Sequence, residues 1–169
     1  MTSEGQRLTH VDESGAARMV DVSGKDVTVR TATASGRVLV SPEVVALLRG
    51  GGVPKGDALA VARIAGIQAA KRTPDLVPLC HPIAIHGVEV DLQVTDDSVL
   101  VSATVRTADR TGVEMEALTC VAVAGLALVD MVKAVDRAAT ITDVRVESKS
   151  GGRSGEWRRT APSSVTSPS

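Results

Sequence analysis

The chain has 169 residues, 43% of them hydrophobic, and a formal net charge of −1 at pH 7. A chain of this length folds as one domain with a sizeable core. The near-neutral charge argues against bulk attraction to nucleic acid, and a single Trp without Phe or Tyr leaves no stacking surface for single strands. We expect neither a nucleic-acid nor a membrane partner, since no signal sequence or uninterrupted membrane-length apolar run is evident.

The domain boundaries and the two cysteines follow from composition. We expect a flexible N-terminus over 1–7, a single domain over 8–156 and a disordered tail over 157–169, which is rich in Ser, Arg and Pro. Cys80 and Cys120 lack the spacing of a metal site, so we expect no bound metal. Two free thiols are typical of a reducing compartment and indicate a cytoplasmic protein.

The first half of the chain predicts a strand and two helices. Val27, Val29 and Thr31 alternate as one face of a strand. Ser41 and Pro42 begin a helix as cap and first residue, and Gly50-Gly51-Gly52 ends it. A second helix is expected from the cap residue Asp57 to about Arg72.

The second half predicts a hairpin, a long helix and a last strand. Apolar residues alternate over 88–94 and again over 99–105. Thr111-Gly112-Val113-Glu114 has the pattern of a capping box, and the helix that it opens is expected to reach about Asp136. The last strand contains Ile141, Val144 and Val146.

Leaving out the short first helix, the order is strand, helix, strand, strand, helix, strand. This order predicts an α+β, ferredoxin-like fold with an antiparallel sheet and two helices on one face. The helix over 114–127 is apolar nearly all round, which one sheet face cannot cover. We therefore expect it to contact another subunit as well.

Several ionisable residues lie in or beside these apolar segments. The capping box gives Glu114 a structural role. Glu116 is either an acid favoured by the helix dipole or a residue that takes part in acid–base chemistry. Asp130 and Lys133 share a helix face, as a surface salt bridge or as an acid–base pair in a partly dry site. The apolar run over 121–129 before them favours the second interpretation.

Three loops carry further candidates. His81 lies between Cys80 and Pro82, either as a hydrogen-bonded structural residue or as a site residue on a rigid loop. Lys55 follows a Gly-rich segment and precedes a helix start, where a cation suits a phosphate, although a solvated lysine is the simpler interpretation. The segment over 149–155 combines small residues with cations but lacks the spacing of a P-loop. Together these residues indicate proton-transfer chemistry on an anionic small molecule.

Several motifs, in one order over about positions 8–156, resemble the cyclic pyranopterin monophosphate synthase family (molybdenum cofactor biosynthesis protein C). They lie at 8–10, 19–25, 55–57, 62–73, 78–82, 111–119, 130–135 and 149–152. The resemblance implies a ferredoxin-like subunit in a homohexamer, a trimer of dimers with sites at subunit interfaces. It also implies a lyase that converts 3',8-cyclo-7,8-dihydro-GTP into cyclic pyranopterin monophosphate and pyrophosphate, without a redox cofactor.

The same resemblance assigns roles to individual residues. Asp130 is similar to the acid–base residue of the family, and Lys55 and Lys133 match its catalytic lysines. Substrate-contacting positions implied in the same way are Leu79, Cys80, His81, Met115, Glu116, Lys25, Arg30 and Lys149. Arg153 and Glu156 depart from the family pattern, which has Lys and Asp there. The alternative is a non-catalytic nucleotide-binding regulatory module on the same fold, because fold alone does not assign function.

Overall fold

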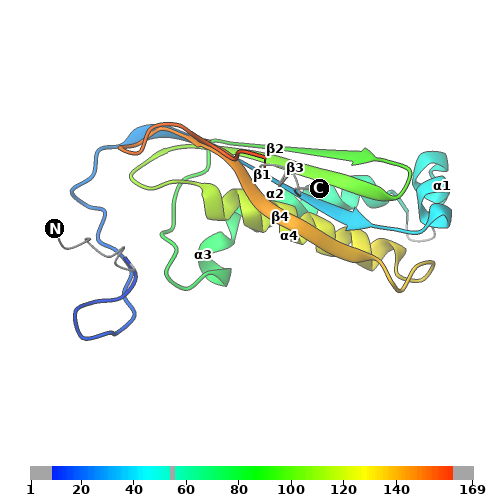
Figure 1. The fold of residues 1–169 in the computed structure, drawn as a ribbon, viewed down its shortest axis with the longest axis horizontal. Helices are drawn as coiled ribbons and strands as arrows, with labels where there is room; N and C mark the ends of the chain where they lie inside the picture. The colour runs from blue at the N-terminus through cyan, green and yellow to red at the C-terminus, as the bar shows by residue number, and fades with distance from the viewer. Residues whose placement is uncertain (1–8, 54–55, 162–169) are drawn as a thin grey trace, which may run out of the picture.

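The structure, a computed structural model, describes residues 9–53 and 56–161. Their elements, drawn in Figure 1, are β1 (Thr28–Leu39), α1 (Pro42–Gly50), α2 (Ala58–Lys71), α3 (Thr73–Leu76), β2 (Gly87–Val94), β3 (Ser98–Asp109), α4 (Glu114–Val132), β4 (Thr140–Ser150) and β5 (Trp157–Arg158). Residues 1–7, predicted as a flexible N-terminus, lie outside the described residues.

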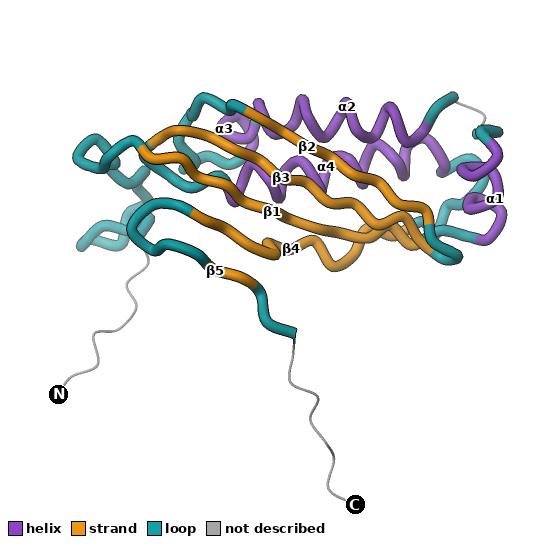
Figure 2. The backbone as a smooth tube through the Cα atoms, turned by 90° about the horizontal axis from the view of Figure 1, so that it is seen from above, coloured by secondary structure: helices purple, strands orange, loops and turns teal. Residues whose placement is uncertain are grey.

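The strands form one antiparallel sheet in the order β2-β3-β1-β4-β5. Helix α2 connects β1 to β2 past the intervening β3, and α4 connects β3 to β4 past β1. Figure 1 shows the sheet as one layer with α2 and α4 along one of its faces, and Figure 2 shows the same strand order from above. The predicted ferredoxin-like α+β fold is confirmed.

Local sequence signals set the ends of the first helices as predicted. The Ser41 hydroxyl accepts a hydrogen bond from the Val44 amide at 3.3 Å, and Gly51 ends α1 in the left-handed region with φ of +71°. The Asp57 carboxylate accepts from the Ala60 amide at 3.0 Å and caps α2. These caps satisfy amides that have no partner inside the helix.

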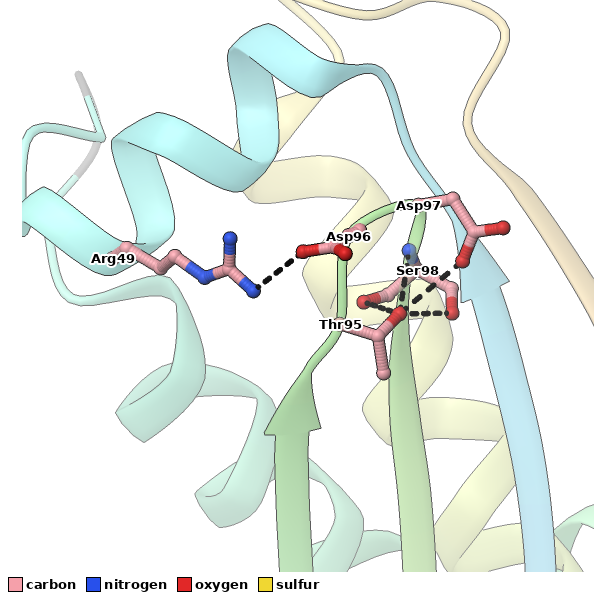
Figure 3. Close-up of polar contacts among 5 residues, drawn as sticks. All are labelled: Arg49, Thr95, Asp96, Asp97 and Ser98. Atoms are coloured by element: carbon pink, nitrogen blue, oxygen red, sulfur yellow. Dashed lines mark hydrogen bonds and ion pairs between the residues drawn. The ribbon is translucent and has the colours of Figure 1, made fainter.

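The turn between β2 and β3 is held by its own side chains (Figure 3). Thr95 Oγ1 accepts a hydrogen bond from the Ser98 amide at 3.1 Å and lies 3.2 Å from Asp97 Oδ1. Arg49 Nη2 at the end of α1 reaches Asp96 Oδ1 at 3.1 Å, with both side chains more than half exposed. This ion pair is a surface contact between α1 and the hairpin.

The ends of α4 differ from the prediction. The N-cap residue is Val113, and no side chain caps the helix, so the capping box prediction is wrong. The Glu114 carboxylate contacts Lys149 of β4 instead. The helix ends at Val132, before the expected Asp136, because 133–135 form a turn.

Two short elements were not predicted. Thr73–Leu76 form α3 after α2. Trp157–Arg158, placed by composition in the disordered tail, form β5 and pair with β4, with Trp157 opposite Lys149. Residues 162–169 of that tail lie outside the described residues.

The core is built from small aliphatic side chains packed closely. Its fully buried members include Ala34, Val101, Ala103, Ala117, Val121, Ala124 and Leu128. Helix α4 is long and apolar enough to cross a membrane by length and composition, but half of that stretch is buried inside the fold. Since small residues line both helices, α2 and α4 approach closely at Gly66.

We expect Gly66→Ala to destabilise the protein. A Cβ at this position would lie 2.9 Å from the Cys120 carbonyl oxygen and 3.2 Å from the Ala124 Cβ. Overpacking of this kind costs about 1–3 kcal/mol, which the better helix propensity of Ala, up to about 1 kcal/mol, offsets in part. Urea denaturation should show a net loss of about 1–2 kcal/mol in the free energy of unfolding.

Gly50→Ala is the matched control for this prediction. Gly50 also lies in a helix, but nothing is within 4 Å of its would-be Cβ. The free energy of unfolding of the control should lie within about 0.5 kcal/mol of the wild-type value, or slightly above it because Ala has the better helix propensity. Equal stability of the two variants would contradict the close approach of α2 and α4.

Candidate functional site

A pocket lined by cations opens where β1, β4 and the N-terminal end of α4 meet. It has a volume of about 260 Å³, and we call it the cationic pocket after Lys25, Arg30 and Lys149. Its lining is completed by residues 111–114 and by Gly151 and Ser154 of the β4–β5 connection. Three predicted substrate-binding residues, far apart in the sequence, therefore lie around one space.

Two glycines bring the chain around Arg30. Gly151 and Gly152 both have positive φ, of +92° and +75°. A Cβ at Gly151 would lie 2.2 Å from the Val29 carbonyl oxygen, and one at Gly152 would lie 2.2 Å from Arg30 Nη1. Residues with a side chain rarely adopt this conformation and would collide here, so the Gly-Gly pair permits the close approach. The Arg30 guanidinium is further held by donating from Nε to the Asp109 carbonyl at 3.1 Å.

Glu114 is an acidic member of the cationic pocket. Its Oε1 lies 3.0 Å from Lys149 Nζ, and about a quarter to a third of each side chain is exposed. The capping box motif predicts a structural role for Glu114 at the start of α4 and does not predict this contact. No local motif could have revealed it, because the two residues are 35 positions apart in sequence, numbered 114 and 149.

Two arginines near the cationic pocket were not predicted as site residues. Arg110 donates from Nε to the Lys25 carbonyl at 3.1 Å and so helps to fix the segment that carries Lys25. Arg153 lines an adjoining pocket of about 490 Å³ that shares Lys25 and Arg30 with the cationic pocket. The clustering of Arg with Gly and Ser over 149–155 is the sequence signal that pointed toward Arg153.

The predicted residues of the 79–81 loop meet the start of α4. The Cys80 thiol donates to Glu116 Oε1 at a sulfur–oxygen distance of 3.6 Å. Glu116 is only 1% exposed, and its Oε2 has no hydrogen-bond partner among the described residues. Leu79 and His81 are half-buried beside Cys80, whereas Met115 is exposed. An acid that only interacts with the helix dipole can remain exposed to solvent. The burial of Glu116 therefore favours a further role for this residue.

Burial sets the protonation of these groups. Desolvation raises the pKa of the Glu116 carboxyl, and the nearby Glu114 charge adds to the effect. Desolvation and the Glu116 charge raise the pKa of the Cys80 thiol to about 11, and desolvation raises the pKa of Cys120 to about 12. Both thiols are therefore protonated at neutral pH, unlike thiols that bind metal.

We expect Glu116→Gln to change how stability depends on pH. A raised folded-state pKa contributes stability that is fully present below the unfolded value, near 4.5, and is lost as pH rises through the folded-state pKa. The wild type should lose stability over this range relative to the variant, with a slope difference of at most about 1.4 kcal/mol per pH unit. Urea denaturation at fixed protein concentration, repeated from acidic to neutral pH, measures this difference.

Glu114→Gln is the control for the pH measurement, since it removes a neighbouring carboxylate that is not buried. It should show a smaller difference in slope than Glu116→Gln. Parallel stability curves for Glu116→Gln and the wild type would mean that the Glu116 pKa is the same in the folded and unfolded protein.

His81 connects the loop to the N-terminal segment. Its ring Nε2–H donates to the Val20 carbonyl oxygen. The ring therefore has a structural partner in this chain, which fits the interpretation of a hydrogen-bonded residue. The contact also holds the segment before Lys25 against the 79–81 loop, so the two predicted substrate-contacting regions are linked.

The Asp130–Lys133 pair lies at the opposite end of α4. Lys133 Nζ is 2.8 Å from Asp130 Oδ1, and both side chains are more than half exposed in the single chain. The expected partly dry site is thus not formed by one subunit alone. Glu114 and Asp130 are 16 residues apart on one helix, which corresponds to about 24 Å along its axis. Lys55, the third predicted catalytic residue, lies outside the described residues.

The fold and this geometry define a class of protein: a small ferredoxin-like α+β protein with a cationic pocket and a buried acid near the same end of α4. Among the described residues, no group of three or more His, Cys, Asp or Glu side chains could hold a metal ion. Comparison with known proteins is more specific, because the sequence profile described as "MoaC family" matches residues 19–152. The chain belongs to this family.

Three of the relatives found by comparison are named as cyclic pyranopterin monophosphate synthases. The chain is 74% identical over 160 residues to a cyclic pyranopterin monophosphate synthase of Streptomyces griseus subsp. griseus, covering 95% of this chain and 90% of the relative. It is 74% identical over 162 residues to one of a Nocardioides species, covering 94% and 99%. It is 60% identical to cyclic pyranopterin monophosphate synthase 2 of Mycobacterium tuberculosis, covering 90% and 91%.

Proposed function

We propose that this protein is a cyclic pyranopterin monophosphate synthase, a lyase of molybdenum cofactor biosynthesis. It converts 3',8-cyclo-7,8-dihydro-GTP into cyclic pyranopterin monophosphate and releases pyrophosphate. The observation that carries the proposal is the 74% identity, over nearly the whole of both chains, to proteins of that name. We propose a cytoplasmic location and no redox cofactor.

The cationic pocket supports binding of a triphosphate. Lys25, Arg30 and Lys149 provide positive charge from three separate segments, and Arg153 adds more beside them. Arg can bind two phosphate oxygens at once, whereas Lys acts as a point charge, so the set suits several phosphate groups. Leu79, Cys80, His81, Met115 and Glu116 lie toward the same end of α4 and would contact the remainder of the substrate.

The chemistry itself requires proton transfers, which we assign to Asp130, Lys133 and Lys55. An ion-paired lysine and aspartate can exchange protons with a substrate when a second surface excludes water from them. In one chain Asp130 and Lys133 face solvent, at the end of α4 away from the cationic pocket. We propose that a second copy covers this pair and supplies its own cationic pocket to it.

Exposed apolar side chains support such an assembly. Val61 and Ile64 of α2 and Leu126 of α4 are between 42% and 60% exposed. Exposed apolar groups on adjacent helices are typical of a surface that is buried on association. We propose a homohexamer built as a trimer of dimers, with each site formed by two chains. Light scattering of the purified protein would measure the oligomeric state directly.

The test of the function is turnover. Purified protein incubated with 3',8-cyclo-7,8-dihydro-GTP should release pyrophosphate and form a cyclic pterin monophosphate, both detected by chromatography and mass spectrometry. Tight binding of the intermediate without turnover would reject the synthase. It would favour the alternative, a nucleotide-binding module that uses the cationic pocket for affinity only.

A further inference from the structure

The cationic pocket contains an anion of its own. Lys149, which carries one of its three charges, lies 3.0 Å from the Glu114 carboxylate. Among the described residues, Glu114 is the one acidic side chain in the lining of this pocket. A carboxylate and a phosphate group are alternative partners for the same ammonium group.

The fold leaves room for Glu114 in this position. Its Oε2 lies 2.0 Å from the place where a Cβ on Gly112 would be, so the carboxylate occupies space that any residue other than glycine would fill. The side chain thus folds back over the 111–113 segment, which also lines the pocket. Since Val113 is the N-cap and no side chain caps α4, the capping role that would otherwise account for Glu114 is absent.

We propose that Glu114 competes with the phosphate groups of substrate and product for Lys149, and that this competition limits how tightly pyrophosphate is retained. This inference rests on the proposed function. When phosphate oxygens bind, Lys149 gives up its ion pair with Glu114, and the remaining carboxylate repels the phosphate charge. Both effects weaken binding, and both disappear when the carboxylate is replaced by a neutral amide.

The competition weakens the binding of substrate and of pyrophosphate by a similar factor, but pyrophosphate has less binding free energy to lose. The substrate also contacts the protein through its nucleoside-derived part, and these contacts offset the unfavourable charge. Pyrophosphate has phosphate contacts alone, so the same unfavourable interaction is a larger share of its binding free energy. Glu114 would therefore favour product release without preventing substrate binding, which benefits turnover when release of product is slow.

Binding of inorganic pyrophosphate, measured by isothermal titration calorimetry on the assembled protein, tests the proposal. Glu114→Gln should bind pyrophosphate about two- to fivefold more tightly than the wild type, the range expected for releasing a partly exposed ion pair. Glu156→Gln is the matched control: it also removes one negative charge, but Glu156 lies in a neighbouring pocket, which Lys149 also lines, and not in the cationic pocket. The control should change affinity less than Glu114→Gln does.

A double-mutant cycle with Lys149→Ala identifies the partner. In the Lys149→Ala background, the gain from Glu114→Gln should be smaller than in the wild-type background, since only the repulsion by the carboxylate is removed and there is no longer a lysine to release. A gain of the same size in both backgrounds would mean that Glu114 acts through its charge alone and not through Lys149. That result would overturn the proposed competition.

The outcomes separate this inference from the function on which it rests. If the wild type turns over substrate but Glu114→Gln binds pyrophosphate no more tightly than the wild type, the inference is overturned and the proposed synthase function remains. Absence of both turnover and pyrophosphate binding in the wild type and in Glu114→Gln overturns both. In steady-state assays, Glu114→Gln should also be inhibited by added pyrophosphate at lower concentrations than the wild type, and unchanged inhibition would contradict the role in release.

Discussion

Lys133→Ala and Asp130→Ala should each lower kcat by about 10²–10⁴-fold, the range for removal of a positioned proton donor or acceptor. The protein should remain folded and assembled. The two side chains form an exposed ion pair at 2.8 Å, and exposed pairs contribute only about 0–1 kcal/mol to stability. Pyrophosphate release from 3',8-cyclo-7,8-dihydro-GTP measures the rate, and thermal unfolding with light scattering measures the folded assembly.

The Arg49–Asp96 pair is the control for this prediction. It is also an exposed ion pair, at 3.1 Å, but it joins α1 to the β2–β3 turn (Figure 3). Arg49→Ala should leave kcat within about twofold of the wild type, because most surface substitutions act weakly. Near-normal turnover in both Lys133→Ala and Asp130→Ala would show that the chemistry lies elsewhere.

A mixture of two impaired variants should regain activity if each site is formed by two chains. Lys149→Ala damages the cationic pocket, and Lys133→Ala damages the opposite end of α4. In a mixed dimer, one site contains both substitutions and the other contains neither. Random re-association of equal amounts should therefore restore about a quarter of the wild-type rate, as two-fold symmetry requires. The assay is run at low substrate concentration, where weakened phosphate binding in Lys149→Ala lowers the rate most.

The matched control mixes two variants damaged at the same end. Lys149→Ala with Arg30→Ala should give no recovery, because both residues line one pocket and every mixed site keeps at least one substitution. Recovery of activity in that mixture would mean that the gain does not come from combining an intact cationic pocket of one chain with an intact Asp130–Lys133 end of another. A failure of Lys149→Ala and Lys133→Ala to complement each other would mean that one chain supplies a whole site.

The fold was largely predictable because its signals are local. Ser41 and Asp57 cap their helices through amides three residues away, and alternating valines define the β2–β3 hairpin. The start of α4 was not predictable in this way. The local pattern favoured a capping box, but a contact between Glu114 and Lys149, in different elements, takes the carboxylate instead.

The site could be predicted only in part, for a similar reason. The family resemblance implied Lys25, Arg30 and Lys149 as substrate contacts, and the fold gathers them around one pocket. Burial was harder to infer: Glu116 is almost inaccessible, whereas Asp130 and Lys133 lie open on the single chain. An apolar run predicts that a helix is buried but not which end of it is covered, because that depends on the elements or subunits packed against it.

The sheet edge beside the cationic pocket gives the protein a built-in optical probe. Trp157 is the only tryptophan of the chain, is 43% exposed, and pairs in β5 with Lys149 of β4. The Arg159 guanidinium lies 5.7 Å from the centre of its ring. With no tyrosine or phenylalanine present, the ultraviolet emission of the protein arises from this indole alone. Anions that approach Lys149 therefore change the surroundings of the single fluorophore, and their binding can be followed without a label.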